Sequence, residues 1–82
     1  MYSVELNDLA KEYPQMNFIH CDKNGFVYLS QYEPRYWGWT EKSGRWMASN
    51  LKILYGVKCY LDWRDSVFEI RDYIDKKYYL ET

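Results

Sequence analysis

Residues 17–32 read NFIHCDKNGFVYLSQY, and this stretch determines the predicted centre of the fold. Two apolar runs flank Asn24-Gly25, a dipeptide that is among the strongest short-range signals for a β-hairpin. Two loop lengths fit the spacing. A two-residue loop would mix apolar and polar side chains on both faces of the hairpin, because a shift of one residue exchanges the faces. A three-residue loop over residues 23–25 keeps them apart and places Gly25 in the left-handed position of a bulged turn.

The three-residue loop fixes which side chains lie opposite one another. Cys21 then pairs with Val27 and Ile19 pairs with Leu29, so that all four lie on one apolar face. Cys59 also falls on an apolar position of a later alternating segment. The two cysteines match neither a disulfide framework nor a metal-binding spacing, and buried free thiols in a reducing cytoplasm are therefore expected.

A second hairpin is predicted where the segment EKSGR echoes the first turn, DKNGF. Residues 42–44 would form its loop, with Trp39 opposite Met47 and Trp46 opposite Thr40. The echo is too short to indicate a repeat unit, but it places a second glycine-containing turn between the first hairpin and the next strand.

A long strand is predicted over residues 51–63, LKILYGVKCYLDW, because apolar side chains occupy every odd position. A bend or bulge is expected at Gly56. A helix is predicted over residues 4–13, where the apolar positions have helical spacing, and a second helix over residues 67–79, after a capping box. A strand over residues 66–70 followed by a short helix is the alternative for the C-terminal end.

The predicted fold class is therefore α+β, in a single domain of residues 1–82. An antiparallel meander of about four strands would be flanked by an N-terminal helix and a C-terminal helix. A domain of this size buries only about 60% of the surface of its unfolded chain, so its core must be dense in large side chains. The aromatic content of 21% agrees with that requirement.

Charge is distributed unevenly along the chain, although the net charge is only −1. Residues 1–22 sum to −3, residues 23–58 to +4 and residues 59–82 to −2. No global charge therefore selects a polyanionic partner. The chain has a single histidine, His20, and no nucleophile or acid accompanies it in a motif. The sequence predicts neither an enzyme nor a metal site nor a cofactor.

The basic middle of the chain coincides with RYWGWTEKSGRW at residues 35–46, which holds three of the four tryptophans. Both faces of the predicted hairpin carry an indole, and a single-layer sheet with helices on one side buries only one face well. At least one tryptophan is therefore expected to be partly exposed, and full packing into an aromatic core is the alternative. The candidate partner-binding residues are Arg35, Tyr36, Trp37, Trp39, Arg45 and Trp46.

Several short motifs follow one another along roughly residues 10–70. They are Tyr13-Pro14, Asp22-Lys23-Asn24-Gly25, Tyr32-Glu33-Pro34, the stretch from Trp37 to Trp46, and Trp63-Arg64-Asp65-Ser66. In this order the chain resembles small accessory proteins encoded by tailed bacteriophages and prophages. The resemblance implies a protein that binds one bacterial host protein and blocks it, and it transfers no catalytic residue.

The expected function is stoichiometric binding of a host protein in the bacterial cytoplasm, which inhibits or redirects that protein in host takeover or anti-defence. The second hypothesis is a nucleic-acid or nucleotide-binding module, in which the basic middle contacts phosphates and the aromatic side chains stack on bases. No apolar run approaches the roughly 18 residues that a membrane span requires, so no membrane partner is expected.

Overall fold

The computed structural model describes residues 2–59, 61–71 and 77–81. Within them the backbone forms short strands, two α-helices and one 3₁₀ turn. In chain order the elements are β1 (Tyr2–Glu5), α1 (Leu6–Glu12), β2 (Phe18–Cys21), β3 (Phe26–Ser30), α2 (Gly38–Ser43), β4 (Leu51–Cys59), η1 (Trp63–Asp65), β5 (Phe68–Glu69) and β6 (Lys77–Glu81). The predicted α+β class is confirmed.

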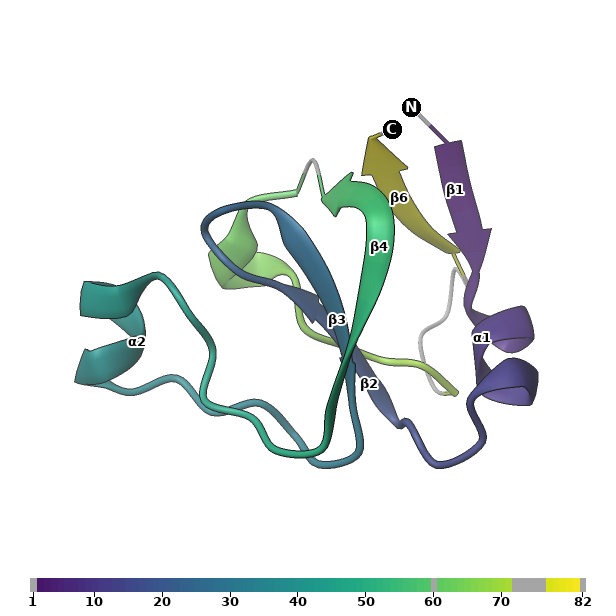
Figure 1. Ribbon diagram of the computed structural model, residues 1–82, viewed down its shortest axis with the longest axis horizontal. Helices are drawn as coiled ribbons and strands as arrows, with labels where there is room; N and C mark the ends of the chain where they lie inside the picture. Colours follow the sequence, from purple (N-terminus) through teal and green to yellow (C-terminus); the bar gives the residue numbers. More distant parts are fainter. Residues whose placement is uncertain (1, 60, 72–76, 82) are drawn as a thin grey trace.

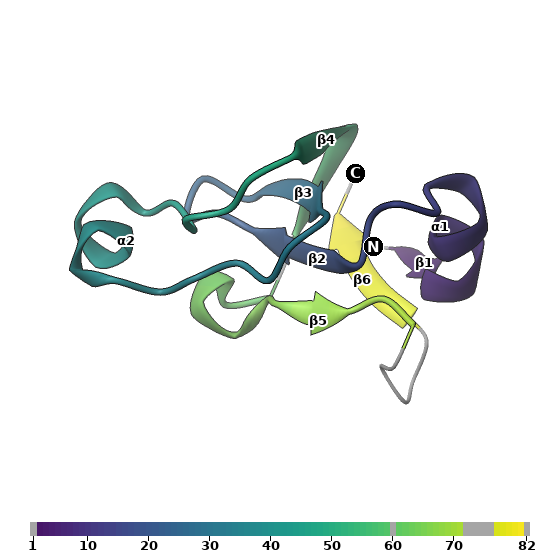
Figure 2. The same cartoon turned by 90° about the horizontal axis from the view of Figure 1, so that it is seen from below.

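One antiparallel sheet of six strands runs through the molecule in the order β1-β6-β4-β3-β2-β5. The meander β2-β3-β4 forms its middle, as the sequence predicts, whereas the outer strands come from the two ends of the chain. The helix α1 lies at one end of the molecule and α2 at the opposite end (Figures 1 and 2). Three strands of the predicted meander of about four are therefore present, and they form the middle of a larger sheet.

The β2–β3 hairpin has the predicted register, in which Ile19 pairs with Leu29 and Cys21 with Val27. The backbone of Gly25 is left-handed, with a φ of 87°, so the three-residue loop is confirmed. All four paired side chains are buried. The hairpin therefore supplies the centre of the hydrophobic core.

The core joins α1 to one face of the hairpin. Its buried apolar members are Leu6, Leu9, Ile19, Cys21, Val27, Leu29, Trp63 and Ile70. The predicted apolar stripe of the first helix is confirmed, since its first two positions are buried and Ala10 and Tyr13 pack against the core. The predicted start at residue 4 was wrong, because residues 2–5 pair with β6 as a strand and the helix begins only after them.

A bulge bends β4 where the sequence predicts an irregularity. Val27 pairs with Leu54, whereas the adjacent Phe26 pairs with Lys58. Residues 55–57 fall between these two pairs, and Gly56 is the middle one. The predicted strand over residues 51–63 ends earlier than expected, since β4 stops at Cys59.

The predicted second hairpin was wrong, because Lys42 and Ser43 of its loop belong to the helix α2 and Met47 pairs with Arg35 instead of Trp39. Thr40 Oγ1 accepts a hydrogen bond from the Trp37 N–H at 3.0 Å, which satisfies a donor just before the helix. Gly44 ends the helix with a left-handed φ of 73°, and its N–H donates to Thr40 O at 2.9 Å. A glycine with positive φ suits a helix C-terminus as well as a hairpin loop, and here it serves the helix.

The predicted C-terminal helix over residues 67–79 was also wrong, because the residues at both ends of that range form strands. Phe68 and Glu69 form β5 against β2, and Lys77–Glu81 form β6. Ser66 is not the N-cap of an α-helix: its Oγ accepts from the Cys21 N–H at 2.9 Å and donates to Trp63 O at 2.7 Å. The alternative prediction, a strand over residues 66–70 followed by a short helix, is confirmed for the strand at Phe68 and Glu69, and residues 72–76 lie outside the described residues.

Two glycines of the α2 segment provide a matched test of this helix. We expect Gly44→Ala to lower the free energy of unfolding by about 2 kcal/mol, because a left-handed alanine is strained. Its Cβ would also lie 2.8 Å from the Cβ of Lys23. Gly38→Ala should change stability by less than about 0.5 kcal/mol, since no atom other than those of its chain neighbours and its own helix backbone lies within 4 Å of the added Cβ. Urea unfolding measures both, and equal effects would contradict the assignment of Gly44 as the helix C-cap.

Candidate functional site

Between β3 and β4 the chain leaves the sheet, and we name residues 35–47 of this excursion the tryptophan loop. Arg35 and Met47 close the loop as an antiparallel pair. The Arg35 N–H donates to Met47 O at 2.8 Å, and the Met47 N–H donates to Arg35 O at 3.1 Å. The helix α2 forms the tip of the loop and projects from the sheet at the end opposite α1 (Figure 1).

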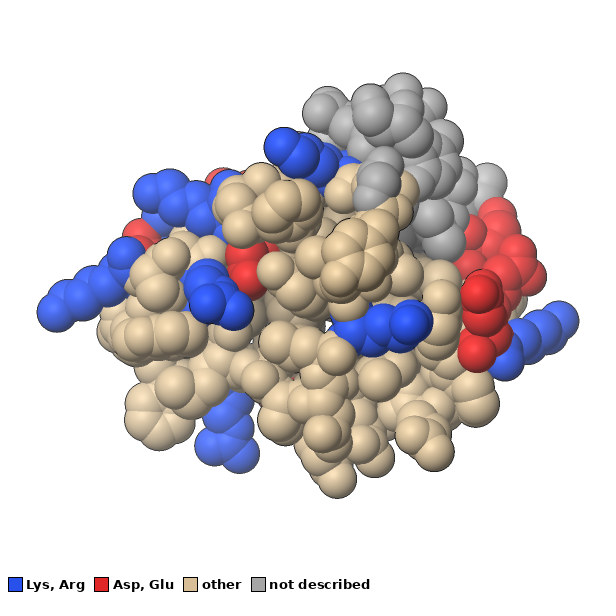
Figure 3. Space-filling view, in the orientation of Figure 1, with Lys and Arg blue, Asp and Glu red and all other residues tan. Residues whose placement is uncertain are grey.

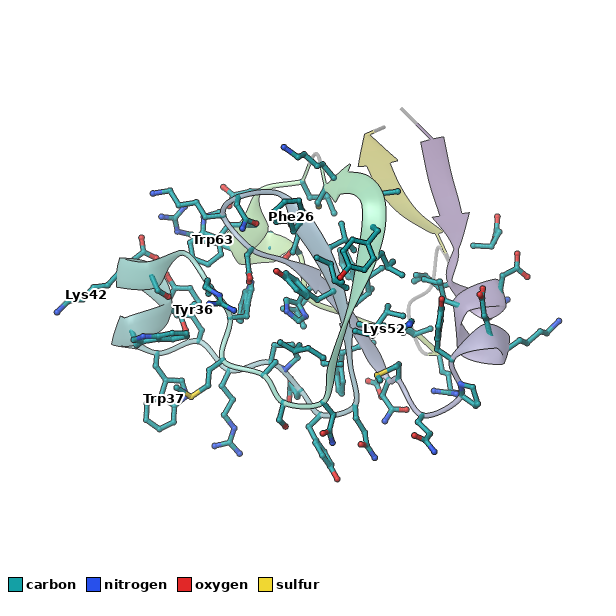
Figure 4. All side chains as sticks on the ribbon, in the orientation of Figure 1. Phe26, Tyr36, Trp37, Lys42, Lys52 and Trp63 are labelled. Carbon is teal, nitrogen blue, oxygen red and sulfur yellow. The ribbon has the colours of Figure 1, made fainter. Side chains whose placement is uncertain are left out.

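The two arms of the loop have an inner face that points toward the sheet, because side chains alternate along extended backbone. Pro34 is buried and Trp46 is half-buried against the core. The ring of Tyr36 lies edge-on to Trp46, with 5.4 Å between ring centroids, and stacks on Trp63 at 6.2 Å. Figure 4 shows Tyr36 and Trp63 between α2 and the sheet. The inner face is therefore an aromatic cluster that attaches the loop.

The outer face of the arms forms a groove with a volume of about 650 Å³. Its lining residues are Tyr32, Glu33, Arg35, Trp37, Met47, Ala48 and Ser49. Most of them are the odd-numbered residues of the two arms, as alternation requires. Trp37 is 53% exposed and points away from the sheet (Figure 4). The groove thus presents an indole, a thioether and a guanidinium to solvent.

The carboxylate of Asp22 holds one arm of the loop against the first hairpin. Its Oδ1 accepts the Trp46 N–H at 2.9 Å, and Arg45 Nε lies 3.8 Å from its Oδ2. Burial raises the pKa of the Asp22 carboxyl, and the hydrogen bond from Trp46 and the charge of Arg45 oppose that rise. A carboxylate that is almost fully buried needs such partners, because an unpaired buried charge is costly.

Three further contacts fix the loop. The indole Nε1–H of Trp46 donates to Trp63 O at 3.0 Å, and the Lys23 N–H donates to Gly44 O at 2.8 Å. The guanidinium of Arg64 binds both carboxylate oxygens of Glu41, with 3.1 Å between Nε and Oε2. These hydrogen bonds to Arg64 lower the pKa of Glu41. The outer groove is therefore carried by a loop whose backbone is attached on several sides.

His20 lies beneath the loop and is only 1% exposed. Its ring stacks on Tyr28 at 5.7 Å and lies edge-on to Trp46 at 6.5 Å. Its Nδ1 is buried without a hydrogen-bond partner among the described residues. Burial lowers the pKa of His20 to about 4, so the ring is neutral at pH 7. His20 is therefore positioned as a residue that packs beneath Trp46.

The structure brings two of the six predicted binding residues, Arg35 and Trp37, into the groove. Trp39 lies on α2 and is 48% exposed, but it does not belong to the groove lining. The expectation that at least one tryptophan is partly exposed is confirmed by both indoles. The alternative, in which the whole aromatic segment is packed into the core, is wrong, because Trp37 and Trp39 are both exposed.

The other three predicted residues are not part of the groove lining, although Tyr36 is 46% exposed and the side chain of Arg45 is 59% exposed. Tyr36 and Trp46 form the inner cluster, and Arg45 lies beside Asp22. Sequence reasoning missed Met47 as a candidate contact, although the predicted hairpin already placed it on the same face as Trp37. The alternation of the two arms is the signal that identifies it.

The chain matches no family model, and no curated protein or solved structure is significantly similar to it. The resemblance to phage accessory proteins therefore stays a prediction. In the described part of the chain, no helix is long and apolar enough to cross a bilayer. The described residues also contain no cluster of three metal-ligating side chains.

The buried state of His20 makes stability depend on pH. Because its folded-state pKa of about 4 lies below the unfolded value of 6.5, the unfolded chain binds more protons between these values, and stability falls as pH falls. Its contribution is fully present above the unfolded pKa. We expect a loss of about 3 kcal/mol in the free energy of unfolding between neutral pH and a pH near the folded value.

The control for this prediction is His20→Phe, which keeps a flat ring against Tyr28 but cannot be protonated. Urea unfolding at the two pH values should show a smaller loss for the variant, since carboxylate titrations are common to both proteins. The same pH dependence in both proteins would mean that the histidine is not the group responsible.

Proposed function

We propose that the chain is a binding protein that accepts one protein partner in the groove of the tryptophan loop. We propose further that the partner is a bacterial host protein, which the chain inhibits or redirects by stoichiometric binding. The observation that carries the proposal is the exposure of Trp37 and Met47 on the outer face of the loop, beside Arg35. Tryptophan, methionine and arginine are enriched at protein interfaces, and tryptophan and arginine dominate their binding energy.

The chemistry of the groove indicates the kind of segment that fits it. Trp37 and Met47 can surround an apolar side chain, and the guanidinium of Arg35 can pair with a carboxylate next to it. Because Glu33 lines the same groove, the partner segment presents an apolar side chain with polar groups beside it that can pair with Arg35 and Glu33. Contiguous exposed apolar surface on a small protein often marks an interaction site, because it is costly to leave in water.

The attachment of the loop also favours binding. Trp46 is held by Asp22 and by Trp63, and Glu41 is held by Arg64, so the arms that carry the groove are fixed from both sides. A surface that is ordered before binding loses less conformational entropy when the partner docks. The groove therefore suits a pre-formed contact more than a segment that folds on its target.

The choice of a host protein as partner comes from the resemblance to phage accessory proteins. The bacterial cytoplasm as the place of action has one further support. Cys21 is buried and Cys59 is half-buried, which suits cysteines of a reducing compartment.

The proposed function involves no catalytic step. A general base must contact the proton that it removes, and the ring of His20 is buried beneath Trp46. The groove residues Arg35, Trp37 and Met47 recognise a partner by burial and charge, and no cofactor is required.

The test compares Trp37→Ala with the wild-type chain. Tagged protein is incubated with a nuclease-treated bacterial lysate, and a retained protein is then purified and titrated by calorimetry. We expect a 1:1 complex that Trp37→Ala weakens by about 2 kcal/mol or more, because a central buried indole is lost from the interface. The variant should have the same free energy of unfolding as the wild type, since much of the Trp37 side chain is exposed.

Trp39→Ala is the matched control, because it removes a similarly exposed indole from the same loop but outside the groove. It should leave the affinity within about threefold of the wild type, the range of a near-neutral interface position. If the two variants bound the partner with the same affinity, whether strong or weak, the groove would not be the binding site.

A further inference from the structure

The groove of the tryptophan loop contains two opposite charges that have no partner among the described residues. Glu33 and Arg35 both line the groove and are both exposed. The ion pairs in the described part of the chain involve other side chains. A molecule that covers the groove must offer a cation to Glu33 and an anion to Arg35, because an unpaired charge is costly to bury.

The two charges lie symmetrically about Pro34. Pro34 is buried toward the sheet, so alternation along the backbone points the side chains on either side of it outward. Consider a second copy of the chain that faces the groove across a two-fold axis, which crosses the backbone at Pro34 and lies parallel to the groove surface. This rotation reverses the direction of the backbone and places Glu33 of each copy over Arg35 of the other. Both charges of both copies are then paired.

The apolar side chains of the groove are complementary under the same rotation. Tyr32 and Trp37 line the groove at opposite ends of residues 32–37 and are 58% and 53% exposed. Reversal of the backbone brings Trp37 of one copy toward Tyr32 of the other. Met47 is 43% exposed and is the backbone partner of Arg35, so it lies beside the ion pairs. Aromatic side chains and methionine are enriched in the buried centre of interfaces.

The surroundings of the groove do not oppose the approach of a second copy. Glu33 and Arg35 are the charged residues of its lining, so the net charge of the lining is zero. Uncharged side chains cover most of the lower part of the molecule in Figure 3, where the arms of the tryptophan loop lie, whereas Asp and Glu side chains gather over α1. Figure 4 shows Trp37 on this lower side. Two copies can therefore meet here without net repulsion.

We propose that a second copy of the chain occupies the groove, in a two-fold symmetric dimer held by two Glu33–Arg35 ion pairs and by the packing of Trp37. This inference rests on the proposed function in regarding the groove as a binding surface, and it adds a form of regulation. The dimer covers the residues that recognise the host protein, so self-association and partner binding exclude one another. An interface made by one loop from each copy is small, and small interfaces belong to transient complexes.

Sedimentation equilibrium over a range of protein concentrations measures the association. We expect a monomer–dimer equilibrium with a dissociation constant on the order of 0.1 mM, in the weak range of small interfaces. Trp37→Ala should weaken it at least about tenfold, and Trp39→Ala, outside the groove, should change it less than about threefold. A chain that stays monomeric up to about ten times that dissociation constant would overturn the proposal.

Exchange of the charges tests the two-fold arrangement. Glu33→Arg and Arg35→Glu should each weaken self-association at least about tenfold, because like charges then face one another in both pairs. An equal mixture of the two single variants should form a heterodimer, since every facing pair is again of opposite sign. The double variant Glu33→Arg/Arg35→Glu should form a homodimer for the same reason. Absence of association in both the mixture and the double variant would overturn the proposal.

The host partner separates this inference from the proposed function. Titration of the chain with the retained host protein should convert the dimer to a 1:1 complex. A monomeric chain that binds the host protein through Trp37 would overturn the dimer and support the proposed function. A dimer that follows the charge exchange, together with no retained host protein, would support the dimer and contradict the proposed function.

Discussion

The carboxylate of Asp22 connects the hairpin that forms the core to the loop that carries the groove. Its backbone takes part in the first turn, since the Gly25 N–H donates to Asp22 O at 2.8 Å and the Asp22 N–H donates to Phe26 O at 3.2 Å. Its buried side chain accepts the Trp46 N–H from the loop. A buried carboxylate without partners is strongly unfavourable, so Asp22 is stable in this position only when the loop is docked. Together with the hydrogen bond from the Lys23 N–H to Gly44 O, this contact makes the hairpin and the tryptophan loop stabilise one another.

The parts of the fold that follow from local chemistry could be predicted from the sequence. The register around Gly25 is one of them, because one positive-φ residue and four apolar positions determine it together. The strand β5 was predicted only as the alternative to a helix, because its two residues pair with Phe18 and Ile19, far away in the sequence, and the spacing from Val67 onward suited a helix equally well. The turn at Gly44 was ambiguous for a different reason: left-handed backbone ends a helix as readily as it closes a hairpin.

The composition of residues 35–46 located the candidate site, but it could not show which side chains point outward and which point toward the sheet. The sequence placed the tryptophan-rich segment at the surface and expected an exposed indole. Which indole is exposed depends on where the inner face of the loop docks, and that is set by the contacts of Trp46 with Asp22 and with Trp63. Neither contact has a local signature in the sequence. Once Trp46 is fixed inward, alternation along the arms places Arg35 and Met47 outward.

The edge of β4 bears on which surfaces of the sheet are open to partners. In the described residues, β4 pairs with β6 only at Lys58 and Cys59, so the strand before the bulge has a free edge. Lysines and bulges are features that natural sheets use against edge-to-edge association, and this edge has Lys52 together with the bulge at residues 55–57. Strand addition is therefore disfavoured along β4.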